Sequence, residues 1–155
     1  MTFLARDQPT GSRGANLVMP RLNQPARPYP KNSRAAHVSP NKRLVESYLS
    51  TTDKSKLGPM LADDIEWVEW GDGVPPSGVV TRGKEAHVQN YGDNKLRSEV
   101  HRLTEENDVV VAEGTARVTT KDGKHLSVRF VNIFEVENGK IKRKSSFGAL
   151  IDGKG

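Results

Sequence analysis

A single amide interrupts an apolar strand face near the end of the chain. Alternate side chains of a strand point to the same side, and Asn132 falls in the middle of a row that is otherwise apolar. The other members of the row are Val128, Phe130, Phe134 and Val136. An amide is neutral at every relevant pH and donates hydrogen bonds, so it can polarise a carbonyl group. Asn132 is therefore either a structural amide bonded to nearby backbone or a group that points into a ligand cavity.

Two further polar side chains fall on predicted inward faces. The Ser-Pro pair at 39–40 is typical of a helix start, and the apolar stripe that follows carries Tyr48, whose hydroxyl needs a partner if it is buried. A short strand over residues 65–70 places Trp67 and Glu69 on one face, just before a loop rich in Gly and Pro. Tyr48 is either a core residue or a site residue, and Glu69 is either a solvated carboxylate or part of a site.

Length and composition limit the classes of function. The chain has 155 residues, which is enough for one domain with a real core, and 34% of them are hydrophobic. It has no cysteine, which excludes disulfides, thiolate metal sites and cysteine nucleophiles. No apolar run approaches the roughly 20 residues of a membrane span, and no secretory apolar segment follows Met1. We therefore expect a cytoplasmic protein with no membrane partner.

The positive charge belongs to the first part of the chain. Residues 1–40 hold six basic residues and one acidic residue, whereas residues 41–155 hold 18 of each, so the net charge of +5 lies in the tail. Residues 1–38 are also rich in Pro, Arg, Asn, Ser and Gly, which predicts a disordered basic arm. A leader without function, a transit peptide or weak contact with nucleic acid or membrane are alternatives for this arm. The neutral body predicts no specific nucleic-acid partner.

The body, residues 39–152, predicts one α+β domain. Asn-Gly at 138–139 joins two extended runs within residues 126–147 and is a strong hairpin signal. The expected order is helix, short irregular helix, strand, short strand, helix and four long strands, with Asp63-Asp64 as a turn before the first strand. Helices followed by an antiparallel meander predict a curved, mostly antiparallel sheet wrapped around three N-terminal helices. The space enclosed by such a cone is a natural pocket for a small molecule.

Several local patterns resemble one superfamily over about residues 41–151. The patterns are the turn at 61–65 (LADDI), the loop at 74–78 ending in Ser-Gly, the spacing from Gly123 to Phe134, the turn Gly139-Lys140-Ile141, and Phe147-Gly148. In their order and spacing they resemble the NTF2-like superfamily, and within it the SnoaL-like proteins and the Δ5-3-ketosteroid isomerases. The resemblance implies the cone fold, a small hydrophobic ligand, isomerase or lyase activity, and no cofactor.

The resemblance also implies a site. Tyr48 and Asn132 match the two donors that hold a developing oxyanion, and Glu69, seven residues after Ala62, matches the general base. Two positions depart from the family pattern, because Asn132 replaces a protonated acid and Glu69 replaces an aspartate. The extra methylene of Glu69 moves the carboxylate by about an ångström, a displacement that can change a rate about 100-fold.

Aromatic residues around these positions complete the predicted pocket. Its expected apolar wall consists of Trp67, Trp70, Phe130 and Phe147. Within this hypothesis Glu69 removes a proton next to a carbonyl while Tyr48 and Asn132 hold the oxygen. The structural alternative makes the two tryptophans ordinary packing residues.

A non-catalytic module for ligand binding or dimerisation is the alternative function. The strand face opposite Asn132 carries Arg129, Val131, Ile133 and Glu135. Its two central aliphatic residues suit an interface better than bulk solvent, so we expect a homodimer.

Two other chemistries have less support in the sequence. A related subgroup hydrolyses epoxides with an arginine flanked by carboxylates, but Thr119 follows Arg117 where an acid is needed, and Ser145-Ser146 replaces another. The four histidines fall on separate predicted elements without short ligand spacing, so each is expected to be a surface or strand residue, and no metal site is predicted.

Overall fold

The computed structural model describes residues 38–91, 95–119 and 123–151 of the chain. The predicted arm, residues 1–38, lies outside these residues except for its last position. The described elements are α1 (Pro40–Ser50), α2 (Lys54–Leu57), the 3-10 helix η1 (Gly58–Met60), β1 (Leu61–Gly71), β2 (Val79–Arg82), α3 (Lys84–Tyr91), β3 (Lys95–Glu106), β4 (Val109–Thr119), β5 (His125–Glu137) and β6 (Lys140–Ile151).

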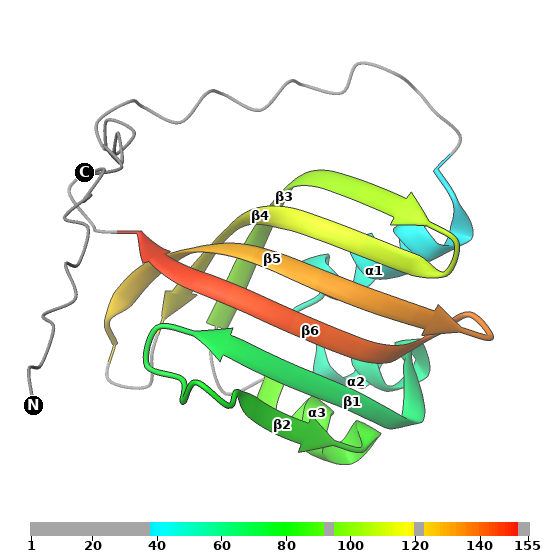
Figure 1. Ribbon diagram of the computed structural model, residues 1–155, viewed down its shortest axis with the longest axis horizontal. Coiled ribbons are helices and arrows are strands. Elements are labelled where there is room, and N and C mark those ends of the chain that lie inside the picture. The colour runs from blue at the N-terminus through cyan, green and yellow to red at the C-terminus, as the bar shows by residue number, and fades with distance from the viewer. Residues whose placement is uncertain (1–37, 92–94, 120–122, 152–155) are drawn as a thin grey trace, which may run out of the picture. The chain divides into compact units, whose positions relative to one another are not determined.

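The strands form one curved sheet in the order β2-β1-β6-β5-β4-β3. All neighbours are antiparallel except β1 and β6, which are parallel. The helices gather on one side of this sheet (Figure 1), where α1 packs under β3 and β4, and α3 packs against β1 and β2. The predicted α+β cone with a mostly antiparallel sheet is confirmed.

Local sequence signals account for the starts of the helices. The Ser39 side chain accepts a hydrogen bond from the backbone N–H of Lys42 at 3.1 Å, and Pro40 occupies the first helical position. The Asp53 carboxylate caps α2 by accepting from the N–H of Ser55 at 3.0 Å. These caps account for the residues at which α1 and α2 begin.

The predicted hairpin between β5 and β6 is present. Asn138 and Gly139 both have positive φ values, 51° and 71°, as a type I′ turn requires. Along β5, residues 130, 132, 134 and 136 are buried and alternate with more exposed neighbours. This alternation along β5 turns Asn132 to the concave face.

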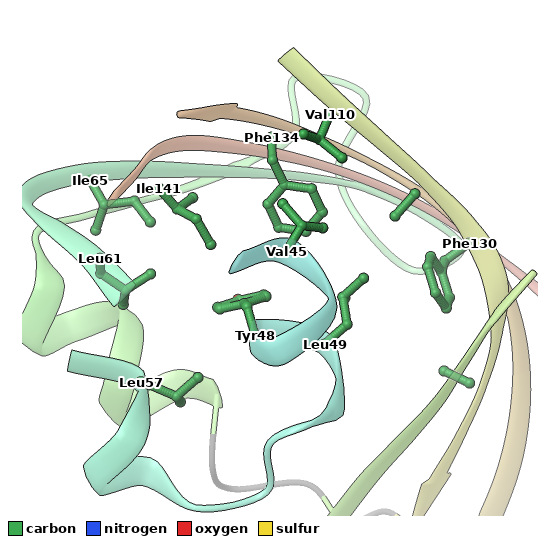
Figure 2. Close-up of a cluster of buried hydrophobic side chains, with 12 residues drawn as sticks. Val45, Tyr48, Leu49, Leu57, Leu61, Ile65, Val110, Phe130, Phe134 and Ile141 are labelled. Atoms are coloured by element: carbon green, nitrogen blue, oxygen red, sulfur yellow. The ribbon is translucent and has the colours of Figure 1, made fainter. Parts of the chain in front are cut away.

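The core lies between α1 and the concave face of the sheet. Tyr48 is completely buried at its centre, and Phe134 meets it edge-on with ring centroids 5.6 Å apart. Figure 2 shows this cluster, in which Phe130 lies to one side of the tyrosine. The other buried members are Val45, Leu49, Leu57, Leu61, Ile65, Val110, Ala112, Ala116 and Ile141.

The start of β1 differs from the sequence prediction. Asp63 and Asp64 were expected to form a turn, but β1 already begins at Leu61 and its pairing with β6 shifts register between Leu61 and Glu66. The exposed carboxylates of Asp63 and Asp64 pair with Lys84 and Lys142, respectively. The prediction of a turn is wrong because the two acidic residues occupy an irregular part of a continuous strand.

Candidate functional site

Strand register brings polar side chains into one row on the concave face. Glu69 of β1 is opposite Ser146 of β6, and Ser146 is opposite Asn132 of β5. Because neighbouring strands lie about 4.8 Å apart, Glu69 and Asn132 are separated by roughly 10 Å along this row. In the adjacent row, Trp67 is opposite Lys144. Four polar groups on three strands therefore face the same enclosed space.

A cavity of about 270 Å³ lies over these two rows. Glu69, Asn132, Lys144 and Ser146 line it from the sheet. Much of the remaining wall is apolar or aromatic and includes Leu49, Trp67, Tyr91, Ala116, Val128 and Phe130. A space of this kind, apolar with a few convergent polar groups, is typical of a small-molecule site.

Three of the polar groups have no hydrogen-bond or ion-pair partner within the described part of the chain. No hydrogen bond or ion pair joins the carboxylate of Glu69, the amide of Asn132 or the ammonium group of Lys144 to another described residue. Asn132 and Lys144 are nevertheless only 7% and 6% exposed. Buried polar groups are normally hydrogen-bonded. Their free bonding capacity is therefore directed at the cavity, where a ligand can use it.

Lys144 lies in an aromatic environment. Its Nζ is 4.4 Å from the ring centroid of Trp67, 5.3 Å from that of Tyr48 and 5.8 Å from that of Tyr91. Burial lowers the pKa of Lys144 from 10.5 to about 8, although the negative charge of Glu69 acts in the opposite direction. The amine is therefore closer to its neutral form near physiological pH than an exposed lysine is.

Tyr48 does not reach the cavity surface, contrary to the sequence hypothesis. Its side chain is 0% exposed, and its hydroxyl is hydrogen-bonded to Nε2 of His87 at 2.7 Å. Burial raises the pKa of Tyr48 well above its usual value, with a smaller contribution from Tyr91. The structure therefore places the Tyr48 hydroxyl in the core, where it already has a partner, and not among the groups that line the cavity.

His87 also departs from expectation, since it is a buried residue of α3 and not a surface or strand residue. Burial and then the positive charge of Lys144 lower its pKa from 6.5 to about 3. The ring is therefore neutral at pH 7. Nδ1 of His87 is the one side-chain nitrogen or oxygen among the described residues that is fully enclosed, with no access to solvent or cavity, and lacks a hydrogen-bond partner.

The predicted aromatic wall divides between the two faces of the sheet. Trp67 and Phe130 line the cavity, and the indole N–H of Trp67 donates to Oγ of Ser146 at 2.9 Å. Trp70 and Phe147 border the cavity at one edge. Strand alternation directs their side chains to the convex face, where the rings stack with centroids 4.9 Å apart. Phe147 is 43% exposed there.

Sequence reasoning missed Lys144 and Ser146 as cavity residues. Ile141 is a buried residue near the start of β6, and simple alternation from it would place Arg143 and Ser145 on the inner face. Instead the β5–β6 pairing shifts register between Glu135 and Val136, which moves Lys144 and Ser146 inward. Only the strand irregularity could have revealed them, and the sequence carries no clear signal for it.

Other kinds of site find little support in the described residues. Across residues 38–91, 95–119 and 123–151, no group of three His, Asp or Glu side chains could hold a metal ion. Arg117 is exposed, and it alternates with the inward-facing Ala116 and thus lies on the convex face of β4. Among the helices that the structure describes, none has the length and apolar character needed to cross a membrane.

Solved structures share this architecture. An NTF2-like protein of unknown function from Burkholderia pseudomallei has 23% identity and a TM-score of 0.58, covering 70% of this chain and 89% of that chain. A LEH-like epoxide hydrolase from M. tuberculosis has 19% identity and a TM-score of 0.58, covering 70% and 82%. A protein named as a ketosteroid isomerase from Kribbella flavida has 18% identity and a TM-score of 0.54, covering 70% and 77%.

The curved six-stranded sheet and its helices therefore define an NTF2-like fold. Residues 42–144, more than half of the chain, match the family model of the SnoaL-like domain. The chain belongs to the SnoaL-like domain family. A comparison with curated proteins finds no match.

Proposed function

We propose that the cavity binds a small, largely apolar carbonyl compound and that Glu69 removes a proton from the carbon next to the carbonyl group. The supporting observation is that the carboxylate of Glu69 and the amide of Asn132 face one cavity without a partner among the described residues. An unpaired carboxylate is a base, and an unpaired amide N–H is a neutral donor. Both are needed to form an enolate.

The oxygen of that enolate needs donors that are already in place. Asn132 supplies its amide N–H group. The hydroxyl oxygen of Ser146 accepts the indole N–H of Trp67, so its own proton stays free to donate into the cavity. Ser146 lies between Glu69 and Asn132 in the row, which suits a carbonyl placed between base and donor. Fixed donors of this kind act without reorganisation during the reaction.

The proposal differs from the sequence hypothesis in one residue. Tyr48, buried against His87, has the role of a core residue that supports the cavity. The hydrolysis of epoxides is not favoured, because the exposed Arg117 lies on the convex face of β4.

The exchange of α-hydrogens for deuterium tests the proposal. A panel of cyclic ketones in D₂O, followed by NMR, should show exchange catalysed by the protein. Glu69→Gln keeps the shape of the side chain and removes the base, so it should lower the exchange rate about 10²- to 10⁴-fold. Glu66→Gln is the matched control, because Glu66 lies on the convex side of the same strand and pairs with Arg82 at 3.1 Å.

The same experiment separates catalysis from ligand binding alone. An exchange rate that falls in Glu69→Gln and is unchanged in Glu66→Gln supports proton transfer by Glu69. If the ketones raise the melting temperature but neither variant nor natural protein exchanges their hydrogens, the domain is a non-catalytic binding module and proton transfer is wrong.

A further inference from the structure

Lys144 is a buried amine that the proton transfer does not use. It is 6% exposed and borders the cavity from β6, in the row next to Glu69 and Asn132. Its ammonium group has neither a hydrogen bond nor an ion pair with any residue in the described ranges. The other lysine described nearby on this strand, Lys142, instead pairs with Asp64. An unpaired lysine in an apolar cavity is costly to keep for structural reasons alone.

We propose that Lys144 is a covalent attachment site that captures an aldehyde or ketone in the cavity as an imine. The lone pair of the neutral amine forms a bond from Nζ to the carbonyl carbon, and a carbinolamine results. The carbon–oxygen bond then breaks, and the oxygen leaves as water with the two protons that the amine gives up. No oxidant or reductant is needed. The attachment does not depend on proton abstraction by Glu69.

The groups around Lys144 keep part of it neutral. Burial lowers its pKa to about 8, and the negative charge of Glu69 on β1 opposes this shift only in part. His87 on α3 is neutral, and burial also raises the pKa of the phenols of Tyr48 on α1 and Tyr91 on α3. At pH 7 roughly one amine in ten is then neutral, against fewer than about one in a thousand for an exposed lysine.

The wall around the amine indicates the class of carbonyl compound. The ring centroid of Trp67 lies 4.4 Å from Nζ of Lys144, and Val128, Phe130 and Leu49 extend the apolar surface. Anionic carbonyl compounds would lose their hydration in this space, because Lys144, the one cationic side chain among the described lining residues, is itself used to form the imine. Uncharged, apolar or aromatic aldehydes and ketones therefore fit best.

Reductive labelling tests the attachment directly. The full chain is incubated at pH 7 with benzaldehyde and cyanoborohydride, which reduces an imine to a stable secondary amine, and the labelled lysines are located by peptide mass spectrometry. Lys144 should be labelled at least tenfold faster than Lys142, and this difference should shrink at pH 10, where exposed lysines also lose protons. Lys144→Arg should lose the fast label, whereas Lys142→Arg should keep it.

Formaldehyde, the smallest aldehyde, serves as the second probe. If Lys144 reacts no faster than Lys142 with either aldehyde, the amine is not an attachment site and the proposal is wrong. Preference for Lys144 with formaldehyde alone would overturn the proposed ligand class, because the cavity would exclude apolar carbonyl compounds. Glu69→Gln should speed the labelling at pH 7, since Glu69 raises the pKa of Lys144, so this test stands apart from any loss of proton transfer.

Discussion

At the scale of single residues, Lys144 is a basic side chain in a buried environment that disfavours its charged form. A folded-state pKa of about 8 against 10.5 means that folding costs about 3 kcal/mol while the amine is charged. The aromatic rings around Nζ offset only part of the lost hydration. A residue with this cost is a stronger candidate for function than an apolar residue of the same size.

Lys144→Met should therefore stabilise the protein by about 3 kcal/mol at pH 7, measured as the free energy of unfolding in urea. The unfolded chain binds more protons than the folded chain between pH 8 and 10.5, so the stability of the natural protein rises through that window. The difference in the free energy of unfolding between Lys144→Met and the natural protein should therefore shrink as the pH rises from 8 to 10.5. Lys142→Met, at an exposed position, should show no comparable gain. A loss of stability in Lys144→Met would contradict the account of this residue.

His87 should make the protein sensitive to acid. Its folded pKa of about 3 is below the unfolded value of 6.5, so its contribution to stability is complete above pH 6.5 and is lost as the pH falls toward 3. At pH 5 the loss amounts to about 2 kcal/mol. In His87→Gln the fall in the free energy of unfolding between pH 7 and pH 5 should be smaller by that amount. For His125→Gln, at an exposed position, the free energy of unfolding should fall as much as it does for the natural protein. An equal fall in both variants would contradict the assignment of this acid sensitivity to His87.

At the scale of elements, the long strands and their turns follow from sequence pattern, and the inner face of β6 does not. The Asn-Gly turn and the alternation along β5 are local properties, so the concave position of Asn132 could be predicted. The inward position of Lys144 depends on a shift of register between two strands, which is decided by packing. Tyr48 was correctly placed on the inner stripe of α1, but its depth depends on His87, 39 residues away.

Space for the aromatic wall comes from small residues on β4. A Cβ at Gly114 would lie 2.2 Å from the backbone oxygen of Glu99 and 2.7 Å from the ring of Phe130. Gly114→Ala should therefore destabilise the protein by about 1 to 3 kcal/mol and shift Phe130, as seen by thermal unfolding and by ligand affinity. The matched control is Gly58→Ala, where a Cβ meets nothing within 4 Å. Equal melting temperatures for the two variants would contradict this prediction, because β4 would then accommodate the added Cβ without a loss of stability.

At the scale of the whole molecule, the convex face of the sheet leaves apolar side chains uncovered. Val131 and Phe147 are directly opposite each other on β5 and β6 and are 37% and 43% exposed. Adjacent exposed apolar residues of this kind are a frequent feature of subunit interfaces. The sequence-based expectation of a homodimer through this face stays a prediction.

Light scattering checks that prediction. The natural protein should have the mass of a dimer at micromolar concentration, and Val131→Glu should have that of a monomer, because each interface would bury two new charges. Val79→Glu is the control, since Val79 is 46% exposed, against 37% for Val131, and lies on the edge strand β2 outside this face. A monomeric natural protein at all concentrations would contradict the expectation.

Under the proposed function, the oxygen of a bound carbonyl compound is held by Asn132, in the cavity that the base Glu69 also lines, and not by Tyr48 in the core. Ketone deuterium exchange in Asn132→Leu and Tyr48→Phe compares these two donors directly. We expect the exchange rate to fall about 10²- to 10³-fold in Asn132→Leu and to change only a few-fold in folded Tyr48→Phe. A large loss in Tyr48→Phe together with unchanged exchange in Asn132→Leu would contradict it.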